Sequence, residues 1–251
     1  MKTIDLNCDL GESFGVYRLD ISDEVLVCFS SANVACGFHA GDPTTMRRTV
    51  RRCLELGIAV GAHPGLPDLV GFGRRRMDVS AEEVYDIVVY QIGALRAFVE
   101  SEGGRLRHVK PHGALYHMAA ERPELAEAVA EAVRRVDASL VLYGLAGSRL
   151  IEAAEKAGLR AASEAFADRA YDRDGKLVPR GVPQAVLTET GAVVEQAVRL
   201  ASEGRVRTAE GAEIVLRVDT ICFHGDGPAV ADGVRAVRRA LAERGIGVAA
   251  P

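Results

Sequence analysis

The sequence predicts an α/β fold, a barrel of about seven parallel strands. Short apolar runs alternate with amphipathic helical stretches along the chain, a pattern typical of βα units. Gly or Pro follows several of these runs, so polar side chains gather where the predicted strands end. A length of 251 residues, 48% of them hydrophobic, is sufficient for one large core, and no linker-like or repetitive segment divides it. We therefore expect a single (βα) barrel domain over residues 1–251.

The predicted strands are short apolar runs bounded by turn residues, at 3–8, 31–36, 58–62, 107–110, 140–143, 160–164 and 219–223. The predicted helices are amphipathic and rich in Ala, Arg and Glu, at 43–56, 80–102, 123–136, 148–157, 189–203 and 228–244. The helix at 80–102 begins with a Ser-x-x-Glu capping box formed by Ser80 and Glu83. Strands that alternate with outer helices in this way favour a barrel.

Three connecting segments are longer than simple turns. Residues 64–78 and 165–184 are polar loops of a length that is common in lids and binding loops. Residues 205–218 are predicted to form a hairpin around Glu210-Gly211 on the rim of the barrel. We expect the two polar loops to contribute to binding.

Charge and composition exclude several classes of function. The formal net charge is -4 and the isoelectric point is near 5.9, so the chain has no overall basic field for a nucleic acid or an anionic membrane surface. No apolar stretch of about 18 residues and no signal-peptide pattern is present, and we expect a cytoplasmic protein. The five cysteines are widely spaced and include no Cys-x-x-Cys pair, which predicts reduced thiols and no structural zinc.

Four of the six histidines share one local setting, an apolar run before them and Gly or Pro within two residues after them. They are His39, His63, His112 and His224. Because the ends of parallel strands meet at one face of a barrel, these imidazoles are predicted to converge on one site. The remaining two, His108 and His117, lack this setting and are predicted to be peripheral.

Polar side chains also gather at the end of the first predicted strand. Asn7 and Asp9 share one face of that strand, and Glu12 follows them. Carboxylates at this place can bind a hard cation or act as a general base, although Asp and Glu are also ordinary turn and helix-capping residues. Asp42 and Asp226 stand close to two of the histidines and near Gly, as suits an oriented base or a metal ligand.

Basic side chains follow the same strand ends. Lys110 ends a buried strand, where an ammonium group is costly unless it meets an anion, or unless the side chain extends outward to solvent. Arginines on the two long loops can clamp phosphate oxygens, or can be ordinary surface residues; they are Arg74, Arg75, Arg169 and Arg180. No phosphate-binding loop of the Walker type and no Gly-x-Gly-x-x-Gly motif is present.

Three cysteines lie at or beside predicted strand ends, where a thiolate nucleophile is one interpretation. They are Cys8, Cys36 and Cys222. Cysteine is among the most frequently buried residue types, so inert buried thiols are the favoured interpretation.

The chain resembles the LamB/YcsF family over essentially its whole length, in six motifs that occur in the same order as in the family. They are DLNCDLGE at 5–12, SANVACGFHAGD at 31–42, GAHP at 61–64, VKPHGALY at 109–116, FADR at 166–169 and HGD at 224–226. The resemblance implies a TIM-like barrel of the glycoside hydrolase/deacetylase kind. It also implies one component of an ATP-dependent 5-oxoprolinase, which opens the lactam of 5-oxo-L-proline to L-glutamate while ATP is cleaved to ADP and phosphate. Two further 5-oxoprolinase subunits, B and C, are implied as partners.

We expect the pocket side chains to divide the work of this reaction. One of the catalytic residues would act as base toward water and the others would stabilise developing charge; they are Asp9, His39, His63, His112 and His224. ATP is expected to bind together with Mg²⁺. Its phosphates, or the substrate carboxylate, are expected to contact Lys110, Arg169 and Arg180. The residues expected to bind substrate are Asn7, Glu12, Asn33, Asp42 and Asp226.

Two alternatives stay open. The chain alone could be a metal-dependent hydrolase or deacetylase of a small amide or N-acyl sugar, with a separate divalent metal held by Asp9, His63 and His112. It could also be a non-catalytic subunit that binds the substrate and delivers it to other subunits. The sequence is compatible with a homo-oligomer, and it does not say which component of the complex binds ATP.

Overall fold

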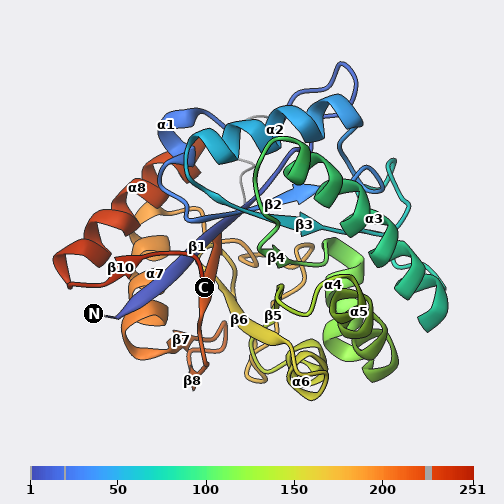
Figure 1. Ribbon diagram of the computed structural model, residues 1–251. Helices are drawn as coiled ribbons and strands as arrows, with labels where there is room; N and C mark the ends of the chain where they lie inside the picture. Colours follow the sequence, from blue (N-terminus) through green and yellow to red (C-terminus); the bar gives the residue numbers. More distant parts are fainter. Residues whose placement is uncertain (1, 20, 224–227) are drawn as a thin grey trace.

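A computed structural model describes residues 2–19, 21–223 and 228–251, and Figure 1 shows it as a closed α/β barrel. The barrel strands are β1 (Thr3–Leu10), β2 (Ser31–Ala35), β3 (Ala59–His63), β4 (His108–Val109), β5 (Val141–Leu145), β6 (Arg160–Phe166) and β9 (Thr220–Phe223). Each pairs in parallel with the next, and β9 pairs with β1 to close the ring. The predicted α/β barrel of about seven parallel strands is confirmed.

Helices surround the barrel, as Figure 1 shows. They are α1 (Asp23–Leu26), α2 (Pro43–Glu55), α3 (Ala81–Ser101), α4 (Gly113–Glu121), α5 (Pro123–Val136), α6 (Arg149–Lys156), α7 (Thr190–Glu203) and α8 (Pro228–Glu243). The six predicted helices are present to within one residue at either end, whereas α1 and α4 were not predicted. Helix α4 follows directly after Pro111-His112 and begins at a glycine, so its sequence has no ordinary helix-start signal.

Local sequence explains how several elements begin. Ser80 Oγ accepts a hydrogen bond from the Glu83 amide (3.1 Å), and the Glu83 carboxylate accepts one from the Ser80 amide (2.8 Å), which confirms the capping box of α3. Helix α2 has Pro43 in its first turn, and Asp42 caps it by accepting a hydrogen bond from the Thr45 amide (2.9 Å). The Asp42 carboxylate, which the sequence predicted to bind substrate, thus caps helix α2 in the structure.

One further strand and a hairpin complete the fold. Strand β10 (Gly247–Val248) pairs in parallel with the first residues of β1. Strands β7 (Arg205–Arg207) and β8 (Glu213–Val215) form an antiparallel pair, so the predicted hairpin is confirmed. Among the helices of the described residues, none combines the length and apolar character needed to cross a membrane.

The apolar core lies mainly between the barrel and its helices, while the inside of the barrel is unusually polar. Asp5, Asn7 and Glu164 are almost fully buried within it. The Asp5 carboxylate accepts hydrogen bonds from four hydroxyl groups, those of Ser30, Ser31, Tyr143 and Thr220. Burial raises the pKa of Asp5, although these hydroxyl groups act in the opposite direction. Hydrogen-bonded polar groups inside the barrel thus form a buried polar layer next to the ends of the strands.

Candidate functional site

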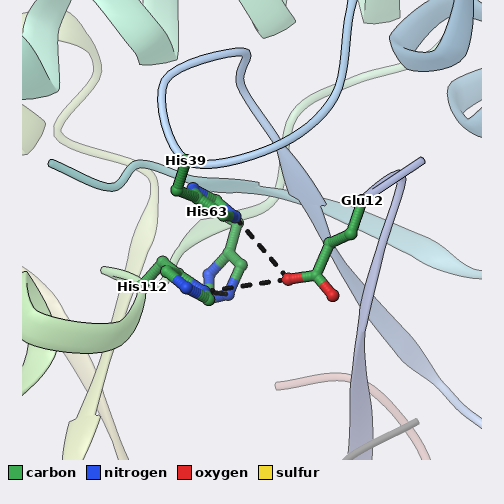
Figure 2. A group of neighbouring side chains, drawn as sticks. All are labelled: Glu12, His39, His63 and His112. Carbon is green, nitrogen blue, oxygen red and sulfur yellow. Dashed lines mark hydrogen bonds and ion pairs between the residues drawn. The ribbon is translucent and has the colours of Figure 1, made fainter. Parts of the chain in front are cut away.

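Three of the predicted histidines meet at the carboxyl end of the barrel. His63 ends β3, His39 lies in the loop after β2, and His112 follows β4 and precedes α4. Glu12, from the loop after β1, faces them (Figure 2). One nitrogen or oxygen atom of each of these four side chains lies within 4.8 Å of the others. The sequence prediction that imidazoles converge here is borne out for these three, whereas His224 and Asp226 lie outside the described residues.

The three imidazole rings pack tightly. The rings of His39 and His112 are stacked, with centroids 3.7 Å apart and planes 2° from parallel. His63 meets both rings edge-on, at 5.4 Å from His39 and 4.8 Å from His112. Burial, together with His112, lowers the pKa of His39 well below its usual range. Burial and His63 likewise lower the pKa of His112 to about 3, so both rings are neutral at pH 7.

Backbone carbonyl groups determine which nitrogen of two rings carries the hydrogen. His63 Nδ1 lies 2.7 Å from the Lys110 carbonyl oxygen, and His112 Nε2 lies 2.8 Å from the Phe72 carbonyl oxygen. A carbonyl oxygen only accepts, so these nitrogens are the donors. In neutral rings the other nitrogens, His63 Nε2 and His112 Nδ1, carry lone pairs, and they face each other at 3.0 Å. Two facing lone pairs repel unless a positive charge lies between them.

The surrounding atoms fit a metal ion at this place. Glu12 Oε1 lies 3.6 Å from His39 Nε2 and 3.8 Å from His112 Nδ1. Neither ring nitrogen of His39 has a hydrogen-bond partner among the described residues, although the side chain is buried. Carboxylate oxygen with neutral imidazole nitrogen is a common donor set for divalent transition metals. Glu12, His39, His63 and His112 therefore form a cluster that could hold a metal ion.

This cluster differs from the metal ligands proposed from the sequence. His63 and His112 belong to both sets. Asp9 lies beside the cluster, with Oδ2 at 3.4 Å from His63 Nε2. The structure thus adds Glu12 and His39 to the residues that face the same point.

A buried lysine supports the Asp9 carboxylate from below. Lys110 Nζ lies 3.1 Å from Asp9 Oδ1, 2.8 Å from Glu164 Oε1 and 3.1 Å from Cys222 Sγ. Burial alone would lower the pKa of Lys110, but its neighbours, Asp9 foremost, raise it well above its usual range. The ammonium group therefore stays charged and is engaged by two carboxylates.

Sequence reasoning missed Glu164. It lies in a strand otherwise composed mainly of small and apolar residues, Arg160–Phe166, and it is fully buried. Burying a carboxylate in such a strand costs free energy unless a cation lies next to it. The presence of a buried carboxylate and a buried lysine in the predicted strands is therefore the signal that could have paired Glu164 with Lys110. Burial and the neighbouring Glu164 raise the pKa of Tyr116 well above its usual range, so this tyrosine also belongs to the buried polar group.

Asn33 holds the Asp9 carboxylate from a second side, and Asn7 holds Asn33 in turn. Asn33 Nδ2 donates to Asp9 Oδ1 and to Asn7 Oδ1, both at 2.8 Å. The oxygen of Asn33 lies 2.8 Å from His108 Nε2, and the His108 ring stacks on Tyr143 with centroids 4.3 Å apart. His108 is therefore buried inside the barrel, and the prediction that it is peripheral was wrong.

A cavity of about 460 Å³ opens above this arrangement. Its inner end is lined by Asp9, Glu12, His63, Lys110 and His112. Arginines of the two long loops also line it, Arg74, Arg76, Arg169 and Arg180, together with Tyr116, Phe166 and Leu177. Asp9, His63, His112, Lys110, Arg74, Arg169 and Arg180 thus line one cavity, and His39 stacks on His112 beside it. Arg75 does not line the cavity and instead pairs with Asp68.

The cysteines near the site are unsuited to nucleophilic attack. Cys8, Cys36 and Cys222 are buried and free. Burial raises the pKa of Cys36 to about 12 and raises the pKa values of Cys8 and Cys222 well above the usual range. A thiolate is the reactive form of cysteine, so these groups stay protonated and inert.

Comparisons with known proteins show the family of this chain. The model of the LamB/YcsF family matches residues 4–251. A relative from Brevibacillus brevis, named as the A subunit of 5-oxoprolinase, is 58% identical over 250 residues, covering 100% of this chain and 98% of its own. A solved structure described as a lactam utilization protein from Thermus thermophilus has a TM-score of 0.93 at 48% identity, covering 99% of this chain and 100% of its own.

A more distant structure shows the fold alone. The catalytic domain of a peptidoglycan N-acetylglucosamine deacetylase from Eubacterium rectale has a TM-score of 0.53 at 10% identity, covering 100% of this chain and 88% of its own. The barrel is thus shared with this deacetylase, whereas identity of about half the sequence or more over the full length is shared with the relatives above. The chain belongs to the LamB/YcsF family.

Proposed function

We propose that this chain is the A component of an ATP-dependent 5-oxoprolinase. It would open the lactam of 5-oxo-L-proline to L-glutamate, with ATP cleaved to ADP and phosphate, in a complex with subunits B and C. The observation that carries the proposal is the cavity whose inner end gathers Asp9, Glu12 and two histidines, in a chain 58% identical to a relative named as a 5-oxoprolinase component. A protein named as one subunit works with others, so we expect partners to complete the reaction.

The chemistry of the substrate explains why such a site is needed. A lactam is a resonance-stabilised amide, so water attacks it slowly unless the carbonyl group is activated and the water is deprotonated. Phosphorylation of the lactam oxygen by ATP would activate the carbonyl carbon. Asp9 is the candidate base, because Lys110 and Asn33 hold one of its oxygens and leave the other near His63. Water held between this oxygen and the lactam would lose its proton to it.

The hydrogen positions of the histidines limit what they can do. His112 Nδ1 carries a lone pair in its neutral ring, so it accepts a proton or binds a cation and does not donate a hydrogen bond to an oxyanion. We therefore place charge stabilisation on a bound cation. A divalent metal held by Glu12, His39, His63 and His112 would supply Lewis-acid stabilisation of negative charge.

The same cluster favours a second candidate function. A metal-dependent hydrolase of a small amide or N-acyl sugar, acting without partners or ATP, needs a carboxylate base beside a metal site, and Asp9 stands beside the cluster. The full-length identity to the Brevibacillus relative makes the oxoprolinase the preferred proposal.

Glutamate release from 5-oxo-L-proline distinguishes these candidates. We would assay the purified chain with and without ATP, with and without subunits B and C, and with a chelator. Release that needs ATP and the full mixture supports the oxoprolinase. Release by this chain alone, lost with chelator and unaffected by ATP, supports the metallohydrolase and overturns the first proposal.

Two variants test the site within the complex. Asp9→Ala and His112→Ala should each abolish turnover while the barrel stays folded, because they remove the candidate base and one candidate ligand. Arg173→Ala, an exposed change in the loop after β6, is the matched control and should keep full activity. Full activity in both site variants, with binding of the lactam retained, would instead favour a non-catalytic component that delivers the substrate.

A further inference from the structure

Arg169 is a buried cation in the wall of the cavity. Its side chain lines the cavity, yet the residue is only 3% exposed. Its guanidinium donates to two backbone carbonyls, from Nε to Ala185 (3.2 Å) and from Nη2 to Val178 (2.6 Å). Within residues 2–19, 21–223 and 228–251, no carboxylate forms an ion pair with it. Carbonyl groups satisfy some of its five N–H donors but do not neutralise its charge.

A second guanidinium stands close by. Arg180 is exposed and lines the same cavity, and its segment is held to Arg169 through the Val178 carbonyl. Burial lowers the pKa of Arg169, and the positive charges of Arg180 and Arg74 act in the same direction, whereas the neighbouring Asp168 and Tyr171 oppose them. A buried cation without an ion-paired carboxylate is unfavourable, and an anion held between Arg169 and the exposed Arg180 would offset both the burial of Arg169 and the repulsion between the two guanidinium groups.

We infer that Arg169 and Arg180 form an oxyanion subsite that takes the carboxylate of the lactam substrate. This inference rests on the proposed function and deepens it, because it assigns the residues that recognise the carboxylate and thereby distinguish this substrate from neutral lactams. Phe166 and Leu177 also line the cavity, and their apolar side chains suit the methylene edge of a small ring. The lactam bond would then point toward Asp9 and His63. Neutral lactams, which lack the carboxylate, would leave the two cations unpaired and bind poorly.

Binding to the purified full chain tests the subsite without any need for turnover. The probes are 5-oxo-L-proline, its uncharged analogue 2-pyrrolidone, and inorganic phosphate, with affinities measured by calorimetry. We expect 5-oxo-L-proline to bind at least about tenfold more tightly than 2-pyrrolidone, since a charge-assisted bidentate contact distinguishes them. R169Q and R180A should each lose most of this preference, while R173A, on the same loop, should keep it.

Each outcome decides the inference. Equal affinity of the wild-type chain for both lactams, or unchanged affinity for 5-oxo-L-proline in R180A and R169Q, overturns it. A wild-type chain that binds neither 5-oxo-L-proline nor phosphate overturns it as well. Loss of phosphate binding alone in the variants would assign the subsite to a phosphate group and overturn the carboxylate assignment. Arg180 is exposed, so R180A keeps the test valid if R169Q fails to fold.

The activity and binding measurements together distinguish failure of the proposed function from failure of the subsite. If the complete complex released no glutamate, while binding of 5-oxo-L-proline stayed dependent on Arg169 and Arg180, the oxoprolinase proposal would fall and the subsite would stand. If glutamate were released with unchanged kinetics in both arginine variants, the subsite would fall and the function would stand.

Discussion

At the scale of single residues, the site is built from groups that other groups hold in a fixed orientation. Lys110 and Asn33 occupy one oxygen of Asp9, and the other faces His63. Carbonyl groups occupy one nitrogen of His63 and one of His112. Because second partners fix the orientation of each group, the site is preorganised before any ligand arrives.

The ion pair between Lys110 and Glu164 is expected to stabilise the fold strongly. Glu164→Gln removes a buried carboxylate 2.8 Å from a buried ammonium group, and we expect a loss of about 3 kcal/mol in the free energy of unfolding. Glu127→Gln removes the exposed pair with Lys156 and should cost less than about 1 kcal/mol. Urea denaturation of both variants measures the difference, and equal losses would contradict this view of the buried pair.

His108 is expected to make stability depend on pH. Burial and the neighbouring Lys110 lower its pKa to about 3, from an ordinary value of 6.5. Between these values the unfolded chain binds a proton that the folded chain does not. Stability linked to His108 is therefore complete above pH 6.5 and falls as the pH is lowered toward 3, by about 1.4 kcal/mol per pH unit.

Comparison with His108→Gln isolates this effect from other titrating groups. Between about pH 7.5 and about pH 5, the wild-type chain should lose about 2 kcal/mol more unfolding free energy than the variant. Urea denaturation at both pH values provides the measurement. Parallel losses in the two proteins would show that His108 is not held neutral in the fold.

At the scale of elements, the loop between β3 and α3 supports the histidines. The Phe72 carbonyl accepts from His112, the Gly73 carbonyl accepts from the Ala114 amide (2.8 Å), and the Pro64 carbonyl accepts from the His112 amide (2.8 Å). This loop, predicted as a lid or binding loop, is thus tied to the start of α4. It holds the stacked imidazoles in place from one side.

Gly73 is the position in this loop where a side chain cannot fit. Its φ is +63°, and an added Cβ would lie 2.6 Å from His39 Cβ and 2.9 Å from His112 Cδ2. We expect Gly73→Ala to displace the stacked rings, to lower the melting temperature and to abolish most turnover of the complex. Gly93→Ala, in α3 with open space around it, should stabilise the chain by up to about 1 kcal/mol. Unchanged turnover in Gly73→Ala would contradict the supporting role of the loop.

At the scale of the whole molecule, barrel closure places residues from both ends of the chain in one network. Asn7 donates to Thr220 Oγ1 at 2.7 Å across 213 positions of sequence, and to Glu164 at 3.0 Å. The buried polar groups next to the site are therefore held in place only when the whole barrel is closed. A ligand that binds the folded site should consequently stabilise the entire barrel.

A divalent metal is expected to raise the melting temperature. Zn²⁺ or Mn²⁺ at about 100 times its dissociation constant would add about 2.7 kcal/mol, which is a shift of several degrees for a chain of this size. His39→Gln should show little of this shift, because it removes a ligand of the cluster. His117→Gln, which leaves the four cluster residues intact, is the control. A shift of the same size in His39→Gln, or none in the wild-type chain, would exclude the metal cluster.

Local sequence patterns were sufficient to predict the barrel and the place of the site. Hydrophobic periodicity and turn residues are local properties, so seven strands, the outer helices and the capping box of α3 could be predicted from them. The ends of parallel strands must share one face of a barrel, which is why Asp9, His39, His63 and His112 could be predicted to meet. The motifs also identified the family.

The pairing of the buried polar groups, in contrast, depends on the tertiary structure. Glu164 meets Lys110 and His108 meets Asn33, and neither pairing follows from spacing along the chain. The physical reason is that the partner of a buried polar group is set by strand register and by closure between β1 and β9. Register brings together residues that are more than 100 positions apart, and local sequence patterns do not encode that geometry.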